Sequence, residues 1–172
     1  MQVQDILFNE HHSYYKRYLD KLSPEQSLID GFQTGRAEVL QFFSTIPDDK
    51  LLYRYAENKW SVKEVLQHMI DTERIFSYRA FRIGRGDVTP LANFDQNIYV
   101  LPSGADEKSR ADLLEEFDAT RQCSIALLKS LTDKNLTNIG ISSSHPMSAR
   151  AAAFTIIGHD IWHMDILKER YL

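Results

Sequence analysis

The sequence predicts an all-α protein, a four-helix bundle that forms a single domain over residues 1–172. Two observations indicate this fold. Apolar residues recur at intervals of three and four over four long stretches, and glycine and proline gather in the few places between them. At 172 residues a chain buries roughly two-thirds of the surface that it exposes when unfolded, so a stable core is expected without disulfides. The expected helices are 24–46, 62–84, 107–131 and 148–170.

Capping signals mark the start of the first two helices. Ser23, followed by Pro24 and Gln26, predicts a capping box with proline at the first helical position. Ser61 with Glu64 predicts a second capping box. Each box stands directly before a stretch with helical spacing, which supports a helix start at both places.

The later segments carry weaker signals. The fourth stretch ends with Lys168 and Arg170, cations that the dipole of a helix favours in its last turn. The aromatic segment HHSYYKRYLDKL near the amino terminus is compatible with a helical turn or with an extended strap across the bundle. The third stretch has an apolar stripe formed by Leu114, Phe117, Leu128 and Leu131. Two polar residues, Arg121 and Ser124, interrupt it.

Composition excludes several classes of protein. The chain has 20 basic and 24 acidic residues and no long run of one sign, which argues against a nucleic-acid partner. The single cysteine, Cys123, cannot form an internal disulfide and is interpreted as a small apolar residue. The first ten residues lack the pattern of a secretory signal, and no apolar run approaches the ~20 residues of a membrane-spanning helix. We therefore expect a cytoplasmic protein without a membrane partner.

Two histidines suggest a metal site on the fourth helix. His159 and His163 stand four residues apart, so both imidazoles reach the same point beside a helix. With Asp160 between them they resemble the HExxH helix of zinc peptidases. That interpretation is rejected, because only nine residues follow His163 and none supplies the third ligand. A third ligand must come from upstream.

His68 is the expected third ligand, because it lies in the inward stripe of the second helix. At ~1.5 Å per residue, His68 lies about 10 Å along the axis from the start of the second helix. His159 and His163 lie at a level about 10–16 Å from the end of the fourth helix. These levels match only if the second and fourth helices are antiparallel. The long connection from the second helix can span the bundle and let the third helix run parallel to the second. The sequence therefore predicts up-down-down-up topology.

A set of three histidines favours a catalytic metal centre at one end of the core. A single histidine on an apolar face is usually a core residue with a hydrogen bond, but three neutral imidazoles leave positions of a zinc-like ion open for water or substrate. A fourth protein ligand would favour a structural site instead. Asp71, Glu73 and Asp160 are candidates for carboxylates that support the ligands, and they are equally compatible with solvated helix surfaces.

Family resemblance adds to this interpretation. The matching stretches are YYKRYLDKL, NKWSVKEVLQHMIDTERIF, GDVTPLANFDQNIYV and GHDIWHMDILKERYL. Together they resemble the DinB superfamily, which includes YfiT-like metal-dependent hydrolases and bacillithiol S-transferases. The resemblance covers nearly the whole chain and implies an up-down-down-up bundle, a homodimer, and a nickel- or zinc-type ion on His68, His159 and His163. The chain departs at Asp160 and Trp162, where close relatives commonly carry glutamate and histidine.

The expected function is that of a metal-dependent enzyme with a small-molecule substrate. A bound cation stabilises thiolate over thiol and hydroxide over water, so transfer of a low-molecular-weight thiol and hydrolysis are both open, with thiol transfer placed first. Zinc or nickel is expected before iron or manganese. The alternative is a non-enzymatic bundle that binds metal or a thiol. Candidates for the lining of a substrate pocket are Asp95, Gln96, Tyr99, Arg121 and Ser124.

Overall fold

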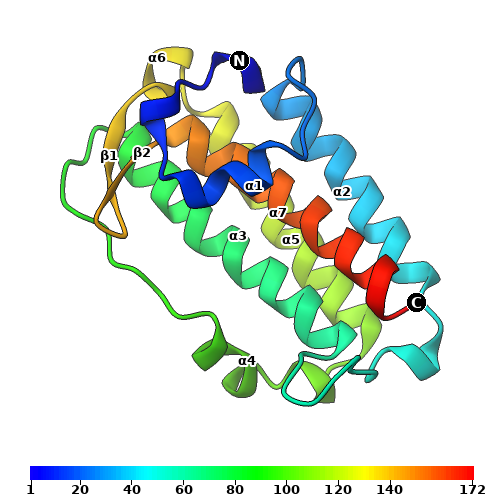
Figure 1. Ribbon diagram of the computed structural model, residues 1–172. Coiled ribbons are helices and arrows are strands. Elements are labelled where there is room, and N and C mark those ends of the chain that lie inside the picture. Colours follow the sequence, from blue (N-terminus) through cyan, green and yellow to red (C-terminus); the bar gives the residue numbers. More distant parts are fainter.

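The computed structural model describes residues 1–172 and has four long helices with an amino-terminal segment laid across them (Figure 1). This architecture confirms the predicted all-α four-helix bundle. No helix combines the length and the hydropathy that crossing a bilayer requires. The long helices are α2 (Leu28–Thr45), α3 (Val62–Gly84), α5 (Arg110–Lys129) and α7 (Ala149–Arg170).

Side-chain caps fix three of the four helix starts. In the predicted box of α3, Ser61 Oγ accepts from the Glu64 amide at 3.0 Å, and the Glu64 carboxylate accepts from the Ser61 amide at 2.8 Å. Ser148 Oγ accepts from the amide of Ala151 at 3.0 Å at the start of α7. Ser109 caps α5, which therefore begins three residues after the predicted start.

The predicted start of the first helix is wrong. Residues 24–27 are not helical, because the first residues of the chain pair with them: the amides of Val3 and Gln4 donate to the carbonyls of Gln26 and Pro24 at 3.2 and 3.0 Å. Ser23 consequently starts a turn, and α2 begins only after Ser27. A contact with a distant part of the chain overrides the local capping signal.

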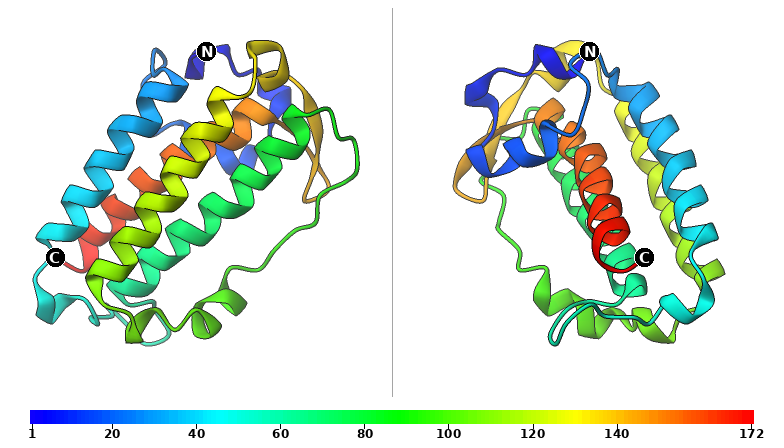
Figure 2. Two further views of the ribbon diagram at one scale, coloured as in Figure 1. Left: turned by 180° about the vertical axis from the view of Figure 1, so that it is seen from behind. Right: turned by 45° about the vertical axis from the view of Figure 1, so that its right-hand side comes forward.

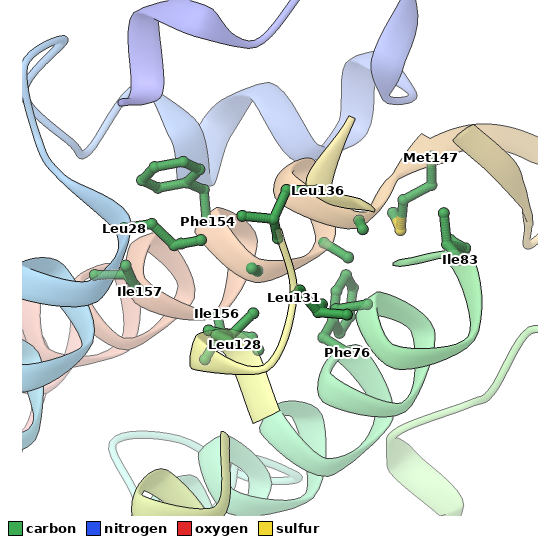
Figure 3. Close-up of a cluster of buried hydrophobic side chains, with 14 of the residues drawn as sticks. Leu28, Phe76, Ile83, Leu128, Leu131, Leu136, Met147, Phe154, Ile156 and Ile157 are labelled. Atoms are coloured by element: carbon green, nitrogen blue, oxygen red, sulfur yellow. The ribbon is translucent and has the colours of Figure 1, made fainter. Parts of the chain in front are cut away.

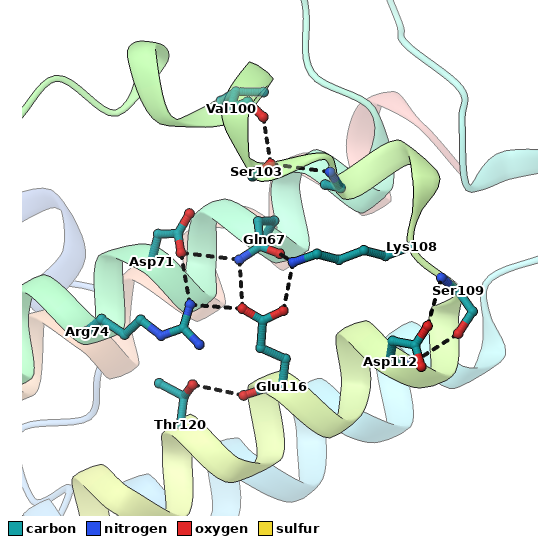
Figure 4. A network of polar contacts seen from close by, with 11 residues as sticks. Gln67, Asp71, Arg74, Val100, Ser103, Lys108, Ser109, Asp112, Glu116 and Thr120 are labelled. Carbon is teal, nitrogen blue, oxygen red and sulfur yellow. Dashed lines mark hydrogen bonds and ion pairs between the residues drawn. The ribbon is translucent and has the colours of Figure 1, made fainter.

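The order and direction of the helices confirm up-down-down-up topology. In Figure 1, α3 and α5 run in one direction and α2 and α7 in the other. Along the pairs of contacting residues between α3 and α5, the residue numbers increase on both helices, as parallel packing requires. The pairs are Gln67 with Glu116, Glu73 with Arg121 and Ser77 with Ser124. Figure 4 shows the first of these pairs, where Lys108 also binds both Gln67 and Glu116, at 2.6 and 2.8 Å.

A connection of about the length of the bundle makes this topology possible. Residues 85–109 pass down one side of the bundle (Figure 2) and contain the short helix α4 (Asn97–Ser103) and a single turn at Ala105–Glu107. Gly104, with a φ of 60°, ends α4 in the left-handed conformation. The chain can therefore begin α5 at the same end of the bundle as α3.

A β-hairpin precedes α7 and was not predicted. Its strands are β1 (Ile139–Ser142) and β2 (His145–Ser148), which pair antiparallel after the one-turn helix α6 (Asp133–Leu136). Ile139 and Ile141 face outward while Gly140 and Ser142 are buried, the reverse of the usual amphipathic strand. The sequence pattern for a strand is therefore absent.

The amino-terminal segment combines the two predicted possibilities. A 3₁₀ turn (Ser13–Tyr15) leads into one turn of helix, α1 (Lys16–Leu19), and the segment lies against α7. The buried carboxylate of Glu10 pairs with Arg150 at the start of α7, which anchors the segment.

The hydrophobic core is divided into two clusters. One lies at the end of the bundle that carries α6 and the hairpin; Figure 3 shows part of it, including Phe76, Leu128, Phe154 and Ile156. The other lies toward the opposite end and includes Val39, Phe43, Val62, Leu66, Leu113, Phe117 and Leu167.

Candidate metal centre

A layer of buried polar side chains separates the two hydrophobic clusters. On α7 the first cluster ends at Ile157 and the second begins at Met164, so the histidine pair falls between them. The predicted group thus lies within the core rather than at one end of it. The layer comprises His68, Thr72, Glu73, Arg121, Ser124, His159 and Asp160.

The three predicted histidines converge here, with His68 and His159 in the layer and the partly buried His163 at its edge. The Nε2 atom of His159 lies 3.0 Å from Nε2 of His68 and 3.1 Å from Nε2 of His163. Nitrogen ligands of a tetrahedral zinc ion are about 3.3 Å apart, given zinc–nitrogen bonds of about 2.0–2.1 Å. All three ligand atoms lie within 4.8 Å of one another, and no cysteine or carboxylate joins the group. The donor set therefore fits a small divalent cation.

Burial keeps the three imidazoles neutral. It lowers the pKa values of His68 and His159 well below the ordinary value, and nearby histidine charge lowers them further. Burial also lowers the pKa of His163 to about 4. Neutral imidazole is the state that binds a metal, so the group can bind a cation at neutral pH without releasing protons.

Neighbouring side chains fix the orientation of the rings. His68 Nδ1 lies 3.5 Å from Thr72 Oγ1, so a proton on Nδ1 can be donated to this hydroxyl and the lone pair of Nε2 left for a metal. The indole of Trp60 lies 4.6 Å from the ring of His68, and the ring of Tyr18 lies 5.3 Å from that of His159. These contacts restrict the rings to the converging arrangement.

An ion cluster lies in the same layer, next to the histidines. Arg121 donates to Glu73 at 2.8 and 2.9 Å and also pairs with Asp160. Burial raises the pKa of Asp160 to about 7 against the opposing charge of Arg121, and Asp160 Oδ1 has no hydrogen-bond donor. Glu73 and Asp160 are therefore not solvated surface charges.

The third carboxylate candidate behaves differently. Asp71 is partly exposed, where it accepts from Gln67 and Arg74, each at 3.2 Å. Figure 4 shows it in a network with Gln67, Arg74 and Glu116. Of the three candidates, the two that the structure places in the buried layer are those that contact Arg121.

A cavity of about 350 Å³ opens beside the imidazole group. His68 and His159 line it, together with Thr72, the aromatic residues of the amino-terminal segment and residues of the connection and the hairpin. Gln96 belongs to this lining, and Gln96 and Tyr99 also border a small recess against His68. Asp95 instead caps a turn through the amide of Asn97 at 2.9 Å.

Sequence analysis missed part of the cavity wall. His12 and His145 both line it, with ring centroids 4.0 Å apart. They come from two segments separated by most of the chain, and each lacks a partner at helical spacing. The aromatic segment gave one usable signal: Tyr14 and Tyr18 stand four residues apart and both face the cavity.

The family model of the DinB superfamily matches residues 32–167. The chain belongs to the DinB superfamily. The matched range begins in the first long helix and ends in the last, and it contains all three histidines. A comparison with curated proteins found no match.

Two solved structures share the DinB fold with this chain. YfiT from Bacillus subtilis, described as a probable metal-dependent hydrolase with an unusual four-helix bundle topology, has a TM-score of 0.72 at 18% identity, over 86% of this chain and 90% of YfiT. The DinB-like protein YjoA from Bacillus subtilis has a TM-score of 0.58 at 18% identity, over 84% of this chain and 88% of YjoA. At this identity the likeness establishes the fold.

Proposed function

We propose that this DinB protein is a metal-dependent enzyme in which His68, His159 and His163 hold one divalent cation. The observation that carries the proposal is the convergence of three neutral imidazoles, of which His68 and His159 are buried and line a cavity large enough for a small molecule. Three nitrogen ligands suit zinc or nickel first, and iron or manganese next.

The reaction proposed is activation of a low-molecular-weight thiol for transfer to an electrophile. A cation with an open coordination position lowers the pKa of a thiol or of water. The residues of the chain supply the rest: the imidazoles place the cation, Trp60 and Tyr18 restrict their rings, and the aromatic wall of the cavity shields the reactants from bulk water. No fourth His, Cys, Asp or Glu joins the group, which favours a catalytic over a structural site.

Hydrolysis is the second candidate reaction. It is supported by the likeness of the fold to YfiT, which is described as a probable metal-dependent hydrolase. A non-enzymatic bundle that binds metal or a thiol is the third alternative, and retention of metal without turnover of any thiol or ester would favour it.

Metal content is the first test. We expect about one equivalent of zinc or nickel in untagged wild-type protein purified without added metal, and none in a His159→Ala, His163→Ala double variant, because two of three ligands are lost. A His11→Ala, His145→Ala double variant removes two histidines outside the group and should retain the metal. Equal metal content in wild type and the His159→Ala, His163→Ala variant, or no uptake by either, would refute the site.

A spectroscopic test distinguishes thiol from water activation. Cobalt(II) replaces zinc in nitrogen sites and gives a thiolate-to-metal absorption band when a thiol coordinates. We expect this band when 2-mercaptoethanol is added to the cobalt form of the wild type. Hydrolysis of an activated ester without any such band would favour the second candidate.

A further inference from the structure

The cavity beside the histidines has no acidic side chain in its lining. Its walls are aromatic, with Tyr14, Tyr15, Phe76 and Phe94, and its polar groups are neutral amides, hydroxyls and imidazoles. The chain as a whole has more acidic than basic residues, 24 against 20. The acid-free lining is therefore a local feature, and it does not repel an anionic ligand.

A buried cation lies directly behind this lining. Arg79 is 1% exposed, and its guanidinium carbon lies 4.8 Å from the ring centroid of Phe76 and 5.5 Å from that of Phe94. Nη2 donates to the carbonyl of Ala92 at 3.2 Å and to Ser143 Oγ at 3.1 Å. Nη1 has no acceptor in the protein.

Arg79 differs from the other buried arginines in its lack of a counter-charge. Arg121 and Arg150 each pair with at least one buried carboxylate, whereas Arg79 forms no ion pair. Burial lowers the pKa of Arg79, as expected for a cation without a carboxylate partner. A buried charge without a partner is costly, so its position calls for a function.

The hydroxyl that Arg79 binds is held by a strained turn. Ser143 and Ser144 form the two-residue loop of the hairpin with φ values of 51° and 67°. Such loops favour asparagine and glycine, because other residues are strained at positive φ. Ser143 Oγ accepts from Arg79 Nη2 at 3.1 Å and donates its proton to Asn93 Oδ1 at 3.2 Å. Ser143 and Asn93 both line the cavity.

We propose that the cavity is selective for small molecules that carry a carboxylate. The hydroxyl of Ser143 turns its proton from Asn93 Oδ1 to the bound carboxylate, and Arg79 lies behind Ser143 as the counter-charge. A singly charged carboxylate matches a single guanidinium better than a doubly charged phosphate does. The aromatic wall accommodates the apolar part of the same molecule. This inference rests on the proposed function in that it names the substrate class of the same cavity, with Arg79 as a positioning residue that acts through Ser143.

The test compares two ligands of one shape that differ in charge. Metal-free protein is titrated with 3-phenylpropanoate and 3-phenylpropanamide, and the two affinities are measured by calorimetry and by NMR. We expect the wild type to bind the acid roughly 10-fold or more tighter than the amide. In Arg79→Met this preference should disappear while the affinity for the amide stays unchanged, which a loss of folding would not produce.

Two further variants complete the experiment. Ser143→Gly relieves the positive φ, so it should fold at least as well as the wild type and still lose preference for the acid. Arg85→Met removes an exposed arginine that directly follows α3 and lies outside the cavity, so it should keep the preference. Equal affinity of the wild type for acid and amide, binding of neither, or a preference retained in both cavity variants would overturn the inference.

Metal content, measured in parallel, separates the two proposals. A wild type that takes up no metal but prefers the acid would refute the metal centre and support the carboxylate site. A wild type that binds metal but shows no preference for the acid would do the opposite.

Discussion

Arg121 places a positive charge in the middle of a four-helix core, where its side chain has no exposed surface. Glu73 and Asp160 surround the guanidinium and hold its pKa above the ordinary value despite burial. Gly35 on α2 lies beside it, and a Cβ there would be in ordinary van der Waals contact with Arg121 Nη1, at 3.4 Å. Each of the three ionic partners is stable in the core only while the others are present.

Removal of Arg121 should therefore be severely destabilising. We expect Arg121→Met to lower the free energy of unfolding by about 3–5 kcal/mol, because two carboxylates remain buried without a cation. Adding Glu73→Gln and Asp160→Asn should restore part of the loss. Urea denaturation gives the free energy of unfolding of the wild type, of Arg121→Met and of the triple variant.

The matched control is Arg36→Met. Arg36 of α2 pairs with Asp118 of α5, the helix that also carries Arg121, but both side chains are partly exposed. Arg36→Met should lower the free energy of unfolding by no more than about 1 kcal/mol. An equal effect of the two substitutions would show that burial of the ion cluster contributes nothing.

At the scale of elements, the contact of the amino-terminal segment with α7 shapes the cavity. The segment supplies Tyr14, Tyr15 and Tyr18 to the cavity wall. These side chains reach the cavity because the backbone of Tyr18 packs directly against α7 at Gly158. A Cβ at Gly158 would lie 2.1 Å from the carbonyl oxygen of Tyr18, which no side-chain rotation can relieve.

Alanine at Gly158 should displace this segment. We expect Gly158→Ala to lower the free energy of unfolding by about 3 kcal/mol through overpacking against backbone. Gly35→Ala makes the same change within a helix where the new methyl group has room, and it should raise stability by up to ~1 kcal/mol through helix propensity. Thermal denaturation compares the two. A Gly158→Ala protein as stable as the wild type would contradict the docking of the segment on α7.

At the scale of the whole molecule, the polar layer joins the two hydrophobic clusters. His68 and His159, whose Nε2 atoms lie 3.0 Å apart, are 91 residues apart in the sequence. A cation on the three histidines would tie α3 to α7 between the clusters and would have no comparable site in the unfolded chain.

Metal should accordingly stabilise the folded protein. At a free zinc concentration about 100 times its Kd, the free energy of unfolding should rise by about 2.7 kcal/mol and the melting temperature with it. A chelator should reverse the effect, and the His159→Ala, His163→Ala variant should show none. A rise of the same size in that variant would place the stabilising metal elsewhere.

Much of this architecture could be predicted from short stretches of sequence. The capping box at Ser61 and the apolar spacing behind it predict α3, and the matching levels of His68 and the pair at His159 and His163 predict antiparallel packing with α7. The box at Ser23 failed because the first residues of the chain pair with Pro24 and Gln26. The homodimer, the metal and the substrate stay predictions.

Helix caps, helical periodicity and i, i+4 spacing involve residues close together in the chain, so they were enough to predict the four helices and the pair of His159 and His163. The level of this pair relative to His68 then predicted the topology. No local pattern predicted that Glu73 and Asp160 are buried around Arg121, or that Arg79 has no carboxylate partner. The segments that line the cavity were likewise not predictable from local patterns. The ionisation and burial of a charge depend on neighbours that folding brings from distant positions in the chain, so these features appear only in the folded protein.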